Sequence, residues 1–144
     1  LHSRYSKDYA TAEAAFEELY RLDPNDTSAA WNLALTLAES QDDLKRSQAV
    51  DLAEIELRKQ PQSAEAYAVL GWCYYKAGRM ADAEKALTVA TSSGGVRLDT
   101  AYYLAQVKRA EAVAMLKSAL AKSGPFAYRP DAIVLLGQLE KMTK

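Results

Sequence analysis

Prolines and glycines divide this chain into short segments that each carry a helical pattern. Between them, apolar residues recur three and four positions apart, the spacing that places side chains on one face of an α-helix. Pro24, Pro61, Pro125 and Pro130 lie between these stretches, where helices are expected to end. The pattern predicts helices at about residues 8–22, 27–40, 45–59, 63–77, 80–92, 99–108, 110–122 and 130–142. It contains no convincing strand or hairpin signal.

The stretch that begins at Ala64 has the most regular pattern. Its members are an aromatic residue, a Leu-Gly pair, a turn glycine and small or large apolar residues at fixed places: Tyr67, Leu70, Gly71, Tyr74, Gly78, Ala83, Leu87 and Ala90. Small residues at Gly71 and Ala83 would let two helices cross closely, and Gly78 permits the positive φ of a tight helix-ending turn. One such hairpin cannot bury its own apolar face, so the pattern indicates a stack of hairpins.

Weaker copies of the pattern lie on both sides of this stretch. Pro24 and Pro61 are 37 residues apart, close to the 34-residue period of tetratricopeptide repeats. These residues resemble the tetratricopeptide-repeat family over nearly the whole chain. The resemblance implies an all-α, right-handed superhelical solenoid of antiparallel helix hairpins, with about three and a half repeats in one domain. The expected divisions are a half repeat at 1–26, repeats at 27–63 and 64–97, a degenerate repeat at 98–124 and a capping helix at 128–144.

The degenerate repeat leaves two alternatives open. It contains Leu104-Ala105, Ala112, Leu116 and Ala119 at repeat-like places, but about five residues of turn are absent. Because no glycine or proline lies between Asp99 and Ser123, the segment could be one continuous helix. We expect a break near Lys108 to Ala110.

The resemblance also implies a binding surface, because the first helix of each hairpin lines the concave face in this family. The places that would line it are Trp31, Asn32, Leu35, Val69, Trp72, Tyr75, Lys76, Tyr102, Tyr103 and Gln106, and of the two adjacent tyrosines we assign Tyr102 to the groove. Tyr102 and Tyr103 cannot both face the same way on a helix, so one belongs to the core and one to the groove. We expect Trp31 to pack mainly in the core, and Trp72 and Tyr75 to be exposed as binding anchors.

The expected function is that of a protein-interaction scaffold that holds a partner peptide or helix in its groove. Asn32, Lys76 and Gln106 would fix the register of that partner. One alternative is a spacer within a longer array of repeats in a multiprotein assembly, such as a bacterial envelope, secretion or polysaccharide-export machine. Another is a homodimer through the N-terminal half repeat, whose Tyr9, Ala12, Phe16 and Leu19 would otherwise face water.

One subset of the family clamps the C-terminal carboxylate of heat-shock chaperones with Lys, Asn and Arg residues. Asn32 occupies one of the required places. Glu65 and Val69 stand where Lys and Arg are needed, and Leu1 stands at an Asn place. The sequence therefore disfavours a carboxylate clamp.

Composition excludes several other classes of function. Eighteen basic and nineteen acidic residues show no basic stripe, which disfavours nucleic acid and membrane surfaces as partners. His2 is the only histidine and Cys73 the only cysteine, so we expect no catalytic residues, no metal site and no cofactor. Cys73 is expected to be a buried, inert thiol. A chain that starts at Leu1 is expected to be a piece of something longer, and its compartment, cytoplasmic or bacterial periplasmic, stays open.

Overall fold

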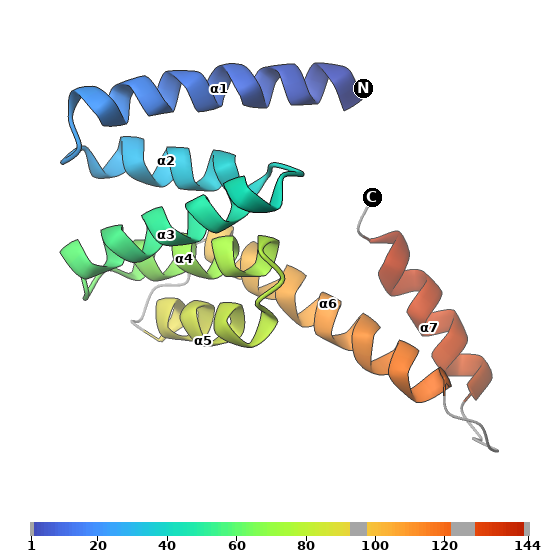
Figure 1. Cartoon of the computed structure of the whole chain (residues 1–144). Helices are drawn as coiled ribbons and strands as arrows, with labels where there is room; N and C mark the ends of the chain where they lie inside the picture. The colour runs from blue at the N-terminus through green and yellow to red at the C-terminus, as the bar shows by residue number, and fades with distance from the viewer. Residues whose placement is uncertain (1, 93–97, 122–128, 143–144) are drawn as a thin grey trace. The chain divides into compact units, whose positions relative to one another are not determined.

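The computed structural model describes the backbone of residues 2–92, 98–121 and 129–142 and the side chains of 8–92, 100–121 and 129–142. Its helices are α1 (His2–Leu22), α2 (Thr27–Ala38), α3 (Asp43–Lys59), α4 (Ala64–Lys76), α5 (Met80–Thr91), α6 (Leu98–Ala121) and α7 (Arg129–Lys141) (Figure 1). These ranges contain no strand. The all-α class predicted from the sequence is confirmed.

Short polar side chains set the start of three of these helices. Asp26 accepts a hydrogen bond from the Ala29 amide at the start of α2, and Ser63 accepts one from the Ala66 amide at the start of α4. Asp42 accepts one from the Leu44 amide at the start of α3. Each bond satisfies an amide that the first helical turn leaves without a partner, so the local sequence fixes where these helices begin.

The chain forms two compact units, Leu1–Leu104 and Ala105–Lys144, where the sequence predicted a single domain. Within the first unit each helix from α1 to α5 packs on the next, and α2 also lies against α4. Pairs α2–α3 and α4–α5 are therefore antiparallel hairpins whose first helices are neighbours (Figure 1). The core between them contains Leu33, Leu37, Val50, Leu52, Val69 and Leu70. This arrangement is a repeat solenoid, as the pattern indicated.

Small residues allow α4 and α5 to approach each other closely. A Cβ atom added to Gly71 would lie 2.6 Å from Cγ of Leu87, a contact that no real side chain makes. Leu87 itself is fully buried, as is Ala83 beside it. Gly78 adopts a φ of 85°, which ends α4 and turns the chain into α5. The sequence assigned these roles to Gly71, Ala83 and Gly78 correctly.

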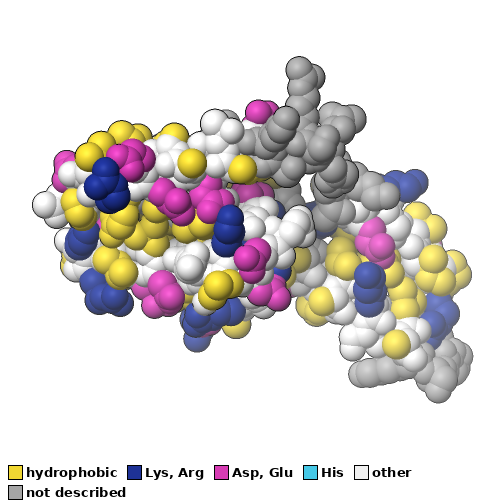
Figure 2. Space-filling model, turned by 45° about the horizontal axis from the view of Figure 1, so that its top comes forward, with side chains coloured by type: hydrophobic (Ala, Val, Ile, Leu, Met, Phe, Trp, Pro, Cys, Tyr) yellow, Lys and Arg dark blue, Asp and Glu magenta, His cyan; other side chains and the backbone are white. Residues whose placement is uncertain are grey.

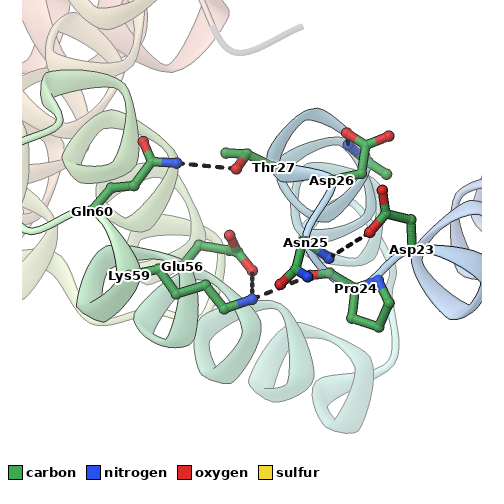
Figure 3. Close-up of polar contacts among 9 residues, drawn as sticks. Asp23, Pro24, Asn25, Asp26, Thr27, Glu56, Lys59 and Gln60 are labelled. Carbon is green, nitrogen blue, oxygen red and sulfur yellow. Dashed lines mark hydrogen bonds and ion pairs between the residues drawn. The ribbon is translucent and has the colours of Figure 1, made fainter.

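Polar contacts join the loop between α1 and α2 to the end of α3 (Figure 3). Lys59 Nζ lies 3.1 Å from a carboxylate oxygen of Glu56 and donates to the Pro24 carbonyl at 3.2 Å. The Gln60 amide donates to the Thr27 hydroxyl at 3.0 Å. Glu56 is 2% exposed, so the Lys59 ammonium balances the charge of a buried carboxylate while it holds the neighbouring loop.

Helix α6 corrects one prediction. The sequence favoured separate helices at 99–108 and 110–122, but α6 runs without a break from Leu98 to Ala121. The expected break near Lys108 to Ala110 is wrong because nothing there ends a helix. The residues are strong helix formers, and a helix stops where a proline, a glycine or a competing cap interrupts its hydrogen bonds. Consequently 98–124 does not contain the hairpin that a degenerate repeat would have.

The second unit consists of the distal part of α6 together with α7. Arg109 donates from Nη1 to the Leu139 carbonyl at 3.4 Å, and Lys117 lies 3.8 Å from Glu140. Arg129 donates to the Leu120 carbonyl at 3.0 Å. No residue of α7 is buried. Among the described residues, none of the helices is long and apolar enough to cross a membrane.

Candidate functional site

A hollow in the first unit is the candidate site. Its volume is about 200 Å³, and three helices line it. Helix α2 contributes Ser28, Trp31, Asn32 and Leu35, helix α4 contributes Glu65, Ala68 and Val69, and the start of α6 contributes Thr100 and Tyr103. Small-molecule sites usually enclose about 300–1,000 Å³. The hollow is therefore of a size for one inserted side chain of a larger partner.

The repeat architecture explains why these side chains meet. Helices α2 and α4 are the first helices of consecutive hairpins and lie side by side. The ring of Tyr103 on α6 stacks on Trp72 of α4, with centroids 4.5 Å apart. Residues of α2, α4 and the start of α6 therefore contribute to one surface, which no single helix could form.

Four residues of the predicted groove come together in this hollow: Trp31, Asn32, Leu35 and Val69. Asn32 is exposed, whereas Trp31 and Leu35 are half-buried and pack against the core. Of the tyrosine pair, Tyr103 lines the hollow, whereas Tyr102, which the sequence assigned to the groove, is absent from the lining and is 54% exposed. Whether these residues bind a partner stays a prediction.

The expected exposure of Trp72 is wrong, because its side chain is only 8% exposed. Tyr103 covers one side of the indole, and Tyr75 and Tyr102 have ring centroids 5.1 and 6.1 Å from it. Tyr75 is half-buried in the same group. Aromatic rings that meet this way stabilise each other beyond the area they bury. Trp72 therefore joins α4 to α6 and offers little surface to a ligand.

Trp72 and Lys76 also share one carboxylate at the end of α2. The indole Nε1 donates to Glu39 at 3.0 Å, and Lys76 Nζ lies 3.3 Å from the other oxygen of Glu39. The same ammonium lies 5.1 Å from the centroid of the Trp72 ring. Lys76 thus already has an anion and an aromatic face as partners, and it is absent from the lining of the hollow. Gln106, the last predicted groove residue, belongs to the second unit and accepts hydrogen bonds from Arg109.

Sequence reasoning missed Ser28, Glu65, Ala68 and Thr100 in the lining. Each lies three or four residues from a predicted member on the same helix, as Ser28 does from Trp31 and Ala68 from Trp72. The helical period therefore could have found them. Glu65 is the only charged residue in the lining of this hollow. Trp31 contributes a second polar feature: its buried Nε1–H has no acceptor among the described residues.

Cys73 is buried, as predicted, and its Sγ lies 3.8 Å from the Ala34 carbonyl. Burial raises the pKa of the thiol far above its ordinary value. The thiolate that a nucleophile needs is therefore strongly disfavoured. In the described part of the chain, no three His, Cys, Asp or Glu side chains form a group that could hold a metal ion.

Comparison with known proteins agrees with this geometry. A family model described as tetratricopeptide repeat matches residues 4–46 and 43–95. No curated protein matches the chain. Members of this family typically act as non-catalytic scaffolds in protein–protein interaction. Because the matched residues cover more than half of the 144-residue chain, the chain belongs to the tetratricopeptide-repeat family.

Proposed function

We propose that this protein binds a segment of a partner protein on the surface formed by α2, α4 and the start of α6, with one side chain of the partner in the hollow. The observation that carries the proposal is the lining itself, to which three helices contribute apolar and polar groups. Leu35 and Val69 offer apolar contact, and Asn32 offers amide donor and acceptor groups at the exposed rim.

The buried aromatic cluster supports this proposal indirectly. Trp72, Tyr75 and Tyr103 hold α4 and α6 together, so the walls of the hollow are preformed. A preformed surface loses less conformational entropy on binding than a mobile one. The anchors expected at Trp72 and Tyr75 thus act as supports for the wall, and the contact surface shifts to Trp31, Asn32, Leu35 and Val69.

The test is a selection of peptides from a random displayed library, repeated with two matched variants. Asn32→Trp fills the rim of the hollow with a large ring, and Gln48→Trp places the same ring at an exposed position of α3. Peptides that bind the wild-type chain and Gln48→Trp but lose affinity by tenfold or more for Asn32→Trp support the proposal. Equal binding to both variants would place the ligand elsewhere.

The alternative of a spacer in a longer array remains a second proposal. The observation that favours it is the packing of α2 on α4, which continues from hairpin to hairpin as in an array. In that case the hollow has no ligand, and the library yields no peptide that distinguishes Asn32→Trp from Gln48→Trp.

A further inference from the structure

The hollow between α2, α4 and α6 has a polar end. The lining residue nearest the start of each of these helices is polar: Ser28, Glu65 and Thr100. Helices α2 and α4 run in the same direction, because Lys76, the last residue of α4, pairs with Glu39, which directly follows α2. The starts of α2 and α4 therefore lie at the same end of the hollow, together with Ser28 and Glu65.

Much of the remaining lining is apolar. Val69 lies one turn after Glu65 on α4, and Leu35 lies two turns after Ser28 on α2. Ala68 and Val69 are buried, whereas Ser28 is exposed. A side chain in the hollow would thus meet apolar walls along its length and polar groups at one end.

Glu65 sets the sign of the charge at the polar end. Among the described residues of the lining it is the only charged one, and it is half-buried. Its side chain has an interaction within the chain, but a carboxylate can accept about four hydrogen bonds. An apolar or acidic side chain in the hollow would take water from this carboxylate without supplying a donor, which is unfavourable. A basic side chain supplies both a donor and the opposite charge.

The helix starts at this end have partial positive charge, which by itself would favour an anion. Each start is equivalent to about half a unit charge, so α2, α4 and α6 together supply about one and a half. At α2, the Asp26 carboxylate accepts from the Ala29 amide, and Glu65 lies in the first turn of α4. Two full negative charges outweigh these partial positive ones, so the balance favours a cation.

The aromatic rings and the surrounding surface agree with this sign. Trp31 and Tyr103 both line the hollow, and the described lining includes no Lys or Arg. The faces of aromatic rings attract cations. On the face of the first unit drawn in Figure 2, acidic and basic side chains are intermixed and neither sign covers it alone. The charge within the hollow, and not a broad field of one sign, therefore selects the side chain.

We propose that the hollow takes a basic side chain, Lys or Arg, of the partner segment, with its charged end at Glu65 and its methylene stem against Leu35 and Val69. The inference rests on the proposed function and names the class of residue that the partner must insert. Lys and Arg meet both requirements of the lining, because their stems are apolar and their ends are charged. A volume of about 200 Å³ has room for one such side chain.

The experiment starts from peptides that the wild-type chain selects from a random displayed library. Those that bind Gln48→Trp but lose affinity for Asn32→Trp occupy the hollow, and they should share Lys or Arg at one position. Glu65→Gln removes the charge and keeps the shape, so it should weaken their binding by about tenfold. Asp51→Asn makes the same change at an exposed position of α3 and should leave binding within about twofold. Fluorescence anisotropy of the labelled synthetic peptides measures the affinities, and circular dichroism checks that the variants fold.

A change in the peptide tests the same contact without altering the protein. Norleucine in place of the shared Lys, or citrulline in place of the shared Arg, removes the charge and keeps an unbranched stem. This replacement should weaken binding to the wild-type chain by about tenfold and have little further effect on binding to Glu65→Gln, because the two changes remove one interaction. Equal losses in both proteins would place the basic group away from Glu65 and overturn the proposal.

The remaining outcomes separate this proposal from the proposed function. Peptides that occupy the hollow without a shared basic residue, or that bind Glu65→Gln as tightly as the wild-type chain, overturn the basic side chain and leave the proposed function standing. A shared acidic residue would show that the helix starts outweigh Glu65. A library that yields no peptide sensitive to Asn32→Trp contradicts the proposed function and this proposal with it.

Discussion

The same Leu-Gly pair occurs in α4 and in α7, with opposite consequences. In α4, Gly71 lies under Leu87 of α5, and the residues around this crossing are almost fully buried. In α7, a Cβ atom added to Gly137 would meet no atom of the described residues within 4 Å, and no residue of the helix is buried. The comparison teaches that the motif only permits a close helix crossing. Whether the crossing forms depends on a second helix that the motif does not contain.

The largest expected effect comes from removing the side chain that fills the closed crossing. Leu87→Ala should lower the free energy of unfolding by about 2–5 kcal/mol, because it leaves a cavity in a fully buried site. Leu135→Ala, at a site 46% exposed, should cost less than about 1 kcal/mol. Urea unfolding followed by circular dichroism measures both, and similar losses would show that α7 is as well packed as α5.

The two glycines themselves test the comparison next, with effects of opposite sign. Gly71→Ala should destabilise the protein by about 1–3 kcal/mol, because the new methyl group overpacks against Leu87. Gly137→Ala should stabilise it by about 0.5–1 kcal/mol, because alanine loses less backbone entropy in a helix and meets no neighbour. Melting temperatures of the two variants should therefore lie on either side of the wild-type value.

Loss of an ion pair should lower the free energy of unfolding more in the first unit than in the second. Lys59→Ala should cost about 1–3 kcal/mol, because it removes the cation that balances the buried Glu56 carboxylate. Lys117→Ala should cost no more than about 0.5 kcal/mol, because both its own side chain and that of Glu140 are largely exposed. High salt should reduce the second effect further. A large loss in Lys117→Ala would contradict the open character of the second unit.

The last expected effect appears only at high pH and comes from the titration of one tyrosine in the closed hairpin. Burial, together with the hydrogen bond that its hydroxyl donates to Glu54, raises the pKa of Tyr74 to about 12. The folded state therefore favours the protonated phenol. Its contribution is complete below the ordinary pKa of 10.0 and is lost as pH rises from there to about 12. Unfolding curves against pH should show a shallower decline in Tyr74→Phe, and ultraviolet titration should lack one late tyrosinate.

Much of the fold follows from local signals in the sequence. The helix starts at Asp26, Asp42 and Ser63 depend on a capping side chain and an amide two or three residues away, so the chain encodes them locally. The turn at Gly78 depends on one residue that can adopt positive φ. The continuity of α6 was mispredicted by analogy with the neighbouring repeats, although the absence of glycine and proline was visible in the sequence.

The candidate site was only partly predictable for a different reason. Trp31, Asn32, Leu35 and Val69, which the family resemblance placed in the groove, line one hollow. The exposure of Trp72, however, depends on which residues of another helix cover it. Tyr103 lies 31 positions later in the chain, and nothing in the spacing of α4 indicates that its ring will stack on the indole.

The sequence by itself thus determined the helices, their caps, the hairpin crossing at Gly71 and the repeat family, because each depends on nearby residues or on a fixed period. The tertiary structure decided which face of each helix is covered. In it, the ring of Tyr103 covers Trp72, and Lys76 forms an ion pair with Glu39. Among the described residues, no atom lies within 4 Å of a Cβ added to Gly137. Burial is a property of two surfaces in contact, and the residues that form the second surface are distant in the chain.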